Sequence, residues 1–152
     1  MSVYTATIEW NRNGEDFAGN KYSRAHKWSF DGGAEIMASA SPHIVPAPWS
    51  VEENVDPEEA FVASLSSCHM LFFLALAGRD GFEIDSYIDS PVGEMSQNSD
   101  GRTAVTKVSL NPQVDYSGER IPTAEQEQAL HHFAHEKCFI ANSVTTEIDI
   151  NI

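Results

Sequence analysis

The chain of 152 residues is poor in positive charge. Lys and Arg together number 9 against 23 Asp and Glu, which gives a formal net charge of -14. Nucleic acids and anionic membrane surfaces are bound through clustered Lys and Arg side chains. We therefore expect no nucleic acid and no membrane among the partners of this chain, and we interpret its acidic surface as a source of solubility.

Long hydrophobic runs and a leader segment are also missing. The longest uninterrupted apolar run, residues 70–77, is far shorter than the roughly 20 residues that a membrane span needs. The first residues show no basic stretch followed by an apolar one, so we expect no signal peptide. Together these absences predict a cytoplasmic protein.

Cysteine is scarce, with Cys68 and Cys138 as the two thiols. In a reducing compartment thiols rest reduced, and a disulfide is more often transient and catalytic than structural. Two interpretations are open from the residues alone. The cysteines are either unrelated core side chains, because free cysteine is among the most buried residue types, or a dithiol that opens and closes during a reaction.

The length and the pattern of apolar residues predict one α+β domain covering residues 1–152. The predicted order is strands, helix, strands, helix and strand, with largely antiparallel sheets packed on two central helices. The expected strands are residues 5–10, 22–30, 35–40, 83–95, 103–116 and 145–152, the last with Ile148, Ile150 and Ile152 facing inward.

The first helix has clear end signals. Asp56 can cap it, Pro57 fits its first turn, Glu59 completes a capping box, and Gly81 follows its end near Arg79. No formal charge occurs between Glu59 and Arg79, so this helix is apolar on nearly every side and must be surrounded. A sheet covers only one side in so small a domain. We expect a second subunit to cover the other.

The second helix is predicted from Thr123, its cap, with Gln126 at the capping-box position. Its predicted apolar face contains Leu130, Phe133, Ala134 and Cys138.

A reactive thiol at Cys68 needs help from elsewhere in the fold. The nucleophile is the thiolate, burial disfavours that form, and a position three turns into a helix gains nothing from the helix dipole. With so few cations available, Arg24 is our candidate for the missing positive charge. Glu58 is expected to hold the Arg24 guanidinium in a bidentate pair.

Two segments carry a resemblance to a known family. The runs DPEEAFVASLSSCH at residues 56–69 and AHEKC at residues 134–138 resemble the two cysteine motifs of the osmotically inducible protein C and organic hydroperoxide resistance protein (OsmC/Ohr) family. The resemblance extends over essentially the full chain. Phe139 follows the second motif where many members have proline, and His69 follows the first cysteine. These departures indicate a side branch of the family, and they leave the substrate open.

The resemblance implies an intertwined homodimer with thiol-dependent peroxidase activity toward organic hydroperoxides, no cofactor, and recycling by an external dithiol. In that scheme Cys68 is the peroxidatic thiol and Cys138 the resolving thiol. Glu58 matches the acidic residue after proline, and Arg24 is the candidate for the thiolate-stabilising arginine. In an unbroken helix Glu58 and Cys68 are about 15 Å apart along the axis. Either the helix is interrupted or a partner chain supplies Glu58 or Arg24, and we expect a site at the dimer interface.

A zinc-binding protein is a competing interpretation. His131, His135 and Cys138 are spaced by four and three residues on one helical face, and Cys68 would add a fourth ligand. We regard this as weaker because His131 and His132 lie in a polar stretch, where histidines are usually solvated.

A hydrolase and a silent binding protein are two more interpretations. A Cys-His hydrolase would pair Cys68 with His69 or His135, but it needs free backbone amides for an oxyanion hole and mid-helix amides are already bonded. A catalytically silent binding protein would keep the fold without turnover at the thiols.

Overall fold

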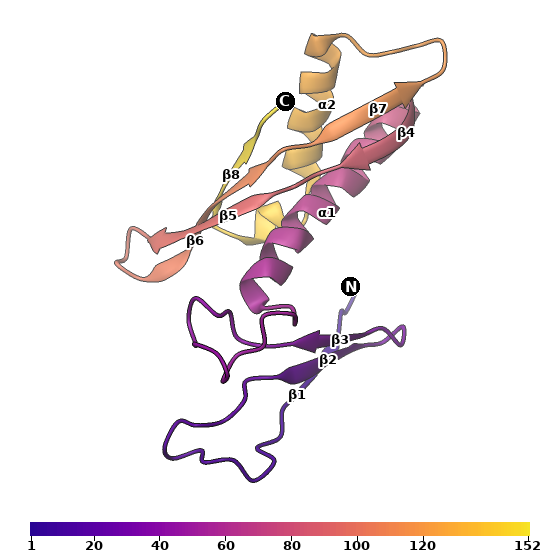
Figure 1. The fold of residues 1–152 in the computed structure, drawn as a ribbon. Helices are drawn as coiled ribbons and strands as arrows, with labels where there is room; N and C mark the ends of the chain where they lie inside the picture. Colours follow the sequence, from indigo (N-terminus) through magenta and orange to yellow (C-terminus); the bar gives the residue numbers. More distant parts are fainter. The chain divides into compact units, whose positions relative to one another are not determined.

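A computed structural model describes residues 1–152 and confirms the α+β class, with two long helices and several antiparallel strand pairs (Figure 1). The elements in chain order are β1 (Ala6–Glu9), β2 (His26–Phe30), β3 (Glu35–Ala38), α1 (Pro57–Arg79), β4 (Glu83–Ile88), β5 (Val92–Gln97), β6 (Thr103–Leu110), β7 (Gln113–Ser117), α2 (Ala124–Lys137), the short 3₁₀ helix η1 (Ala141–Ser143) and β8 (Glu147–Ile150).

The chain forms two compact units, which we call unit 1 (Met1–Ala60) and unit 2 (Phe61–Ile152). Unit 1 contains a three-stranded antiparallel sheet in the order β1-β2-β3. Unit 2 contains the antiparallel pair β4-β7, the sheet β5-β6-β8, and both helices apart from the first turn of α1. Each unit is described by itself, and a single domain over residues 1–152 stays a prediction.

Two predicted strands are each broken in two, which corrects the sequence analysis. Residues 83–95 form β4 and β5, and residues 103–116 form β6 and β7. The breaks coincide with Pro91 and Pro112, which have no backbone N–H to donate to a ladder. β4 and β7 therefore pair in one sheet, while β5 and β6 continue in another.

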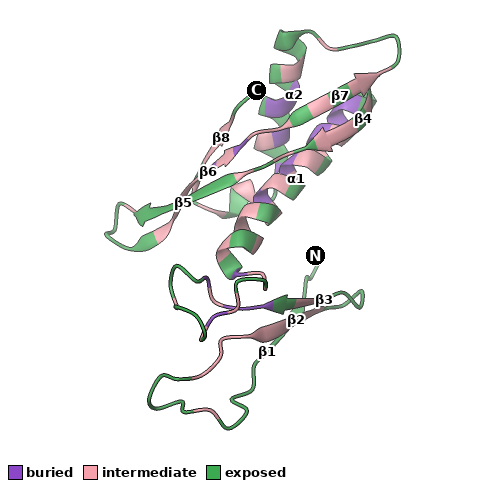
Figure 2. Cartoon of the chain, viewed as in Figure 1, coloured by how far each residue is buried: buried purple, intermediate pink, exposed green.

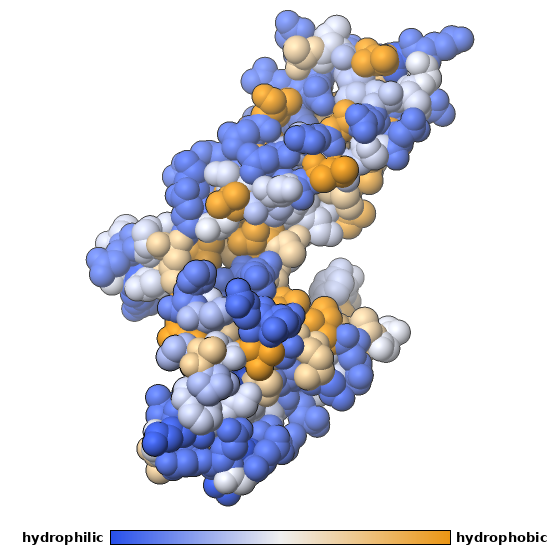
Figure 3. All heavy atoms as spheres, viewed as in Figure 1, coloured by the Kyte–Doolittle hydropathy of each residue, from blue (hydrophilic) through white to orange (hydrophobic).

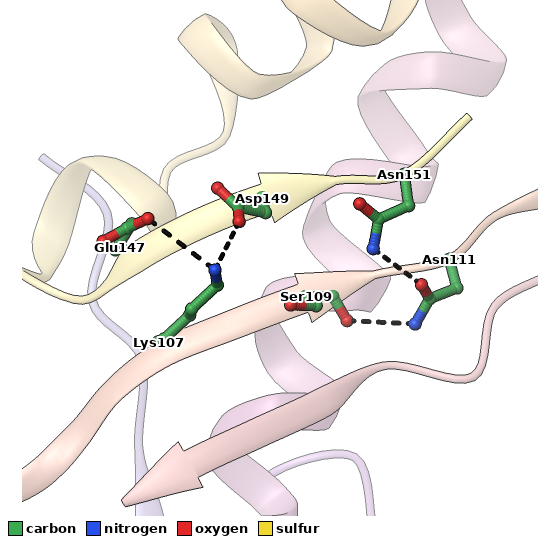
Figure 4. Close-up of polar contacts among 6 residues, drawn as sticks. All are labelled: Lys107, Ser109, Asn111, Glu147, Asp149 and Asn151. Carbon is green, nitrogen blue, oxygen red and sulfur yellow. Dashed lines mark hydrogen bonds and ion pairs between the residues drawn. The ribbon is translucent and has the colours of Figure 1, made fainter. Parts of the chain in front are cut away.

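The last strand is held in place by a polar network (Figure 4). β8 pairs with β6 in parallel. The Lys107 ammonium lies 2.6 Å from Asp149 Oδ2 and 3.9 Å from Glu147 Oε1, so one cation from β6 bridges two carboxylates of β8. Ile148 and Ile150 are half-buried as predicted. Ile152 is 62% exposed, so its predicted inward position is wrong, because it lies beyond the end of the strand.

The ends of α1 match the prediction. The backbone N–H of Glu59 donates to Asp56 Oδ1 at 2.8 Å, and the Asp56 N–H donates to Glu59 Oε2 at 3.1 Å. Gly81 follows the helix with φ of +84°, in the left-handed region that glycine adopts without strain.

α2 also begins with the predicted capping box, because Thr123 and Gln126 exchange side-chain and backbone hydrogen bonds. Its inward face differs from the prediction at two positions. Phe133 is 47% exposed, whereas His131 is 1% exposed. The interpretation of His131 as a solvated side chain is therefore wrong. The rotation of α2 about its axis turns His131 toward α1, where it meets a polar partner.

Unit 2 has its own hydrophobic core. One cluster packs α1 against α2 and β4, and its buried members are Phe73, Leu76, Ala77, Phe82, Leu130 and Ala134. A second cluster packs α1 against β6 around Leu65, Val108 and Leu110. Both clusters use the same side of α1, whose other side is partly exposed in this single chain (Figure 2).

α1 is the one helix long and apolar enough to cross a membrane by length and composition. One such helix is weak support for a span, since the core helix of a soluble protein passes the same test. The face of unit 2 drawn in Figure 3 is mostly hydrophilic, with hydrophobic residues scattered among the polar ones.

Candidate functional site

The two thiols of unit 2 meet where α2 ends against the middle of α1. Cys68 lies about halfway along α1 and is partly exposed, whereas Cys138 is the C-cap residue of α2 and is 1% exposed. Both are free thiols, and their side chains are within hydrogen-bonding reach of each other. The two thiols therefore lie near each other, and the dithiol interpretation stays a prediction.

The two sulfurs have different environments. Burial, reinforced by the hydrogen bond to Cys68, raises the pKa of Cys138 to about 11. The backbone N–H of Ala141 donates to Cys138 Sγ at 3.4 Å and opposes this shift without cancelling it. Cys138 is thus a protonated thiol at neutral pH.

The chain after Cys138 turns sharply and leaves Phe139 on the surface. The Asn142 N–H donates to the Cys138 carbonyl at 3.0 Å, and the Ser143 N–H donates to the Ile140 carbonyl at 3.0 Å, which starts the short helix η1. Phe139 is 70% exposed and meets the edge of Phe72 from α1, with ring centroids 5.0 Å apart. Phe139, which stands where many members of the resembled family have proline, thus adds an aromatic contact between α1 and the segment after α2.

Arg24 and Glu58, both in unit 1, do not form the predicted ion pair. Arg24 Nη1 donates to the Tyr22 carbonyl at 2.5 Å, and Nη2 donates to Asn20 Oδ1 at 2.6 Å. The guanidinium also stacks over the Tyr22 ring, 3.7 Å from its centroid. These local acceptors occupy the guanidinium, while the buried Glu58 Oε2 has no hydrogen-bond partner.

α1 is continuous from Pro57 to Arg79. Glu58 and Cys68 are therefore about 15 Å apart along one unbroken helix. An interruption of the helix, which would have brought both residues to Arg24, is excluded. A contribution from a partner chain stays a prediction.

The zinc interpretation has no ligand set in this structure. No group of three His, Cys, Asp or Glu side chains is arranged to hold a metal ion. The reason is the direction of His131, whose Nδ1 is hydrogen-bonded to His69. The hydrolase interpretation lacks an oxyanion hole, because Cys68 lies mid-helix with its backbone amide inside α1. Its first candidate base, His69, is bonded to His131, and pairing with His135 stays a prediction.

The buried pair His69 and His131 is the feature that the sequence analysis missed. His69 Nε2 and His131 Nδ1 are 3.0 Å apart, and both residues are 1% exposed. Burial lowers the pKa of each imidazole to about 4, so both rings are neutral at pH 7. The available signal was spacing, since His69 falls four residues after Leu65 and four before Phe73, on the buried side of α1.

Comparison with known proteins assigns the family. The model of the OsmC-like protein family matches residues 51–152, and the chain belongs to this family. An OsmC-like protein of unknown function from Vibrio cholerae is similar over 100% of this chain and 99% of its own, with 57% identity and a TM-score of 0.98. A comparison with curated protein sequences finds no match.

More distant solved structures share the fold. An organic hydroperoxide resistance protein from Elizabethkingia anophelis has 17% identity and a TM-score of 0.70, covering 99% of this chain and 93% of that one. The organic hydroperoxide resistance protein OhrB of Bacillus subtilis has 18% identity and a TM-score of 0.67, covering 99% and 98%. At these identities the likeness concerns the fold alone.

Proposed function

We propose that the chain is a cysteine-based peroxidase that reduces organic hydroperoxides. The observation that carries this proposal is the contact between the Cys138 thiol and Cys68 at the meeting point of α1 and α2. Membership of the OsmC-like family supports it, as do the organic hydroperoxide resistance proteins of the same fold. No cofactor is needed for this chemistry, because sulfur itself is oxidised and reduced.

The difference between the two sulfurs assigns their order of reaction. The partly exposed Cys68 thiolate attacks one oxygen of the hydroperoxide, breaks the O–O bond and releases an alkoxide that leaves as the alcohol. The Cys68 sulfenic acid then condenses with the Cys138 thiol, which forms the S–S bond and releases water. An external dithiol reduces this disulfide by thiol–disulfide exchange and is itself oxidised.

Arg24 and Glu58 keep their assigned roles within the proposal. The thiolate needs a positive neighbour, and α1 carries no formal charge between Glu59 and Arg79. Since Glu58 and Cys68 of one chain are too far apart to share one guanidinium, Arg24 of a second copy of the chain would leave its contacts with Tyr22 and Asn20 to serve the thiolate. The buried, unpartnered Glu58 Oε2 is the acceptor that would hold its guanidinium.

A homodimer in the cytoplasm is part of the same proposal. α1 exposes apolar side chains on the side that the unit 2 core leaves uncovered, including Leu71 at 60% exposure. A second copy of the chain would cover this side.

Stopped-flow oxidation tests the proposal directly. Wild-type protein, Cys68→Ser and Cys138→Ser are mixed with tert-butyl hydroperoxide, a fatty-acid hydroperoxide and hydrogen peroxide. We expect faster reaction with the organic hydroperoxides, no turnover in Cys68→Ser, and sulfenic acid trapped by dimedone in Cys138→Ser. Unchanged turnover in Cys68→Ser contradicts the assignment of the nucleophile. Failure of any hydroperoxide to drive disulfide formation in wild type would favour the silent binding protein instead.

A further inference from the structure

A second polar contact between α1 and α2 lies beside the thiols. His69 follows Cys68 in α1, and His131 precedes Cys138 by seven residues in α2. The ring planes of the two histidines are 1° apart with centroids separated by 5.3 Å, and the contacting nitrogens are 3.0 Å apart. The rings therefore meet edge to edge, along the direction in which imidazole N–H groups and lone pairs point.

This hydrogen bond is a directional contact in a largely apolar interface. Its neighbours are hydrophobic, and Phe73 stacks on the His131 ring with centroids 4.1 Å apart. Hydrophobic packing is non-directional and allows small shifts between helices at little cost. A hydrogen bond weakens steeply when its geometry is disturbed, and an unpaired polar group in a core is costly.

Stability alone does not account for a pair of histidines at this place. Each ring leaves its second nitrogen, His69 Nδ1 or His131 Nε2, buried without a partner. Two apolar side chains of similar size would avoid this cost, because they have no polar atoms to desolvate.

The location of the histidine pair suggests that it sets the placement of α2 against α1. Among the α1 residues that contact α2, the two that form polar contacts, Cys68 and His69, are adjacent, and Phe73 adds an apolar contact. On α2 their partners His131 and Cys138 are about 10 Å apart along the axis, or two turns. Two attachment points separated by this distance define both the position of α2 along α1 and the angle between the helices. A shift at the histidines therefore moves the end of α2 that carries Cys138.

We propose that His69 and His131 are positioning residues that set the approach of Cys138 to Cys68 and thereby the equilibrium of the Cys68–Cys138 disulfide. The inference rests on the proposed function, since it concerns the disulfide of that reaction. Neither histidine touches the reacting atoms in this scheme. Both act through the placement of α2.

The test measures the disulfide equilibrium in glutathione redox buffers. Oxidation of the two protein thiols to the disulfide consumes one glutathione disulfide and releases two reduced glutathiones. His69→Gln places an amide nitrogen near the position of the imidazole Nε2, whereas His69→Asn carries the same group one methylene short. We expect His69→Gln to stay within about twofold of wild type and His69→Asn to lower the equilibrium constant about tenfold or more.

Leu65→Val is the control for lost stability, because it shortens a buried side chain one turn earlier on the same side of α1. We expect it to lower the midpoint of urea unfolding without moving the disulfide equilibrium. Equal equilibrium constants for His69→Gln and His69→Asn overturn the inference. So does a shift in Leu65→Val as large as the one in His69→Asn.

A measurement on the wild-type protein does not depend on any variant folding. In uniformly ¹⁵N-labelled reduced protein, we expect a scalar coupling between His69 Nε2 and His131 Nδ1 across the hydrogen bond. Its absence from the folded protein overturns the inference, as does wild-type protein that forms no disulfide with glutathione. Because glutathione replaces the peroxide, a protein that forms the disulfide but reduces no hydroperoxide would contradict the proposed function and leave this inference standing.

Discussion

Unit 1 and unit 2 both contain antiparallel strands, but they differ in the size and polarity of the side chains that they bury. The fully buried side chains of unit 2 include Phe73, Leu65 and Leu110. In unit 1 the buried residues are small or polar, namely Ala38, Ser39, Ser41, Ser50 and Asp56. Large apolar side chains of unit 1 such as Ile8 and Met37 are 60% and 56% exposed.

This difference indicates that only unit 2 has a core sufficient to hold its own strands. Small sheets without a buried apolar face are marginally stable in water. Unit 1 therefore depends on a surface outside itself, and the proposed second copy of the chain would supply one. The thiols lie in unit 2, which has the larger apolar core, and this suits a pair of sulfurs whose spacing must be maintained through oxidation and reduction.

The largest effect is expected from a substitution in the unit 2 core. Phe73→Ala removes a ring that is 0% exposed and contacts both α2 and β4, so we expect the free energy of unfolding to fall by about 3–5 kcal/mol. Met37→Ala in unit 1 is the matched control, with an expected change within about 0.5 kcal/mol for the monomeric chain. Urea titration measures both, and a loss under about 1 kcal/mol at Phe73 would contradict the comparison.

A charge on the uncovered side of α1 tests the need for a partner. Leu71→Asp places a carboxylate on this apolar side, and we expect it to raise the dimer dissociation constant about 100-fold, or roughly 3 kcal/mol. Ile121→Asp changes an equally exposed apolar residue that lies outside α1 and should leave association unchanged. Sedimentation velocity over a concentration series measures the effect. Wild-type protein that stays monomeric throughout would remove the proposed dimer.

The histidine pair predicts an acid-sensitive unit 2. Burial holds the pKa of His69 and His131 near 4, below the ordinary value of 6.5 that applies in the unfolded chain. Above pH 6.5 both states are neutral and the pair adds no pH dependence. Between pH 6.5 and 4 the unfolded chain binds protons that the folded one excludes, so the free energy of unfolding falls as the pH falls. We expect a loss of about 3 kcal/mol from the pair by about pH 5.5.

Urea unfolding at several pH values measures this loss. His132→Gln is the control, because the His132 side chain is 65% exposed and its replacement should leave the pH dependence unchanged. Replacement of both His69 and His131 by Leu should flatten the dependence between pH 6.5 and 4.5. An unchanged slope in that double variant would show that other groups cause the acid sensitivity.

Structural features that residues close in the sequence determine were easier to predict than features that depend on the rest of the fold. The ends of α1 and α2 were predicted because capping boxes such as Thr123 with Gln126 act over three residues. The breaks at Pro91 and Pro112 were missed because apolar and β-branched residues continue on both sides of each proline. Local chemistry thus fixed where elements begin more securely than where they break.

The same contrast between local and long-range causes holds for the candidate site. Placing Cys68 in the first helix and Cys138 in the core at the second followed from the motifs and the periodicity, although α2 ends at Lys137, one residue before Cys138. The side of α2 that turns inward did not, since Leu130, His131 and Phe133 allow two rotations that differ by one position. The contacts of Arg24 with Tyr22 and Asn20 also escaped prediction, because they depend on a loop in which Asn20 has a positive φ of 60°.

The smallest effect we predict compares the two helix starts, one in each unit. Thr123→Ala removes the acceptor for the Gln126 N–H and should cost about 1 kcal/mol. Asp56→Ala removes the acceptor for the Glu59 N–H at a position that is 7% exposed, so its cost should lie nearer the upper end of the range, about 2 kcal/mol. Urea unfolding of both variants measures the difference. A smaller loss at Asp56 than at Thr123 would indicate that the first turn of α1, the part that belongs to unit 1, frays in the native protein, as expected if unit 1 is the less stable unit.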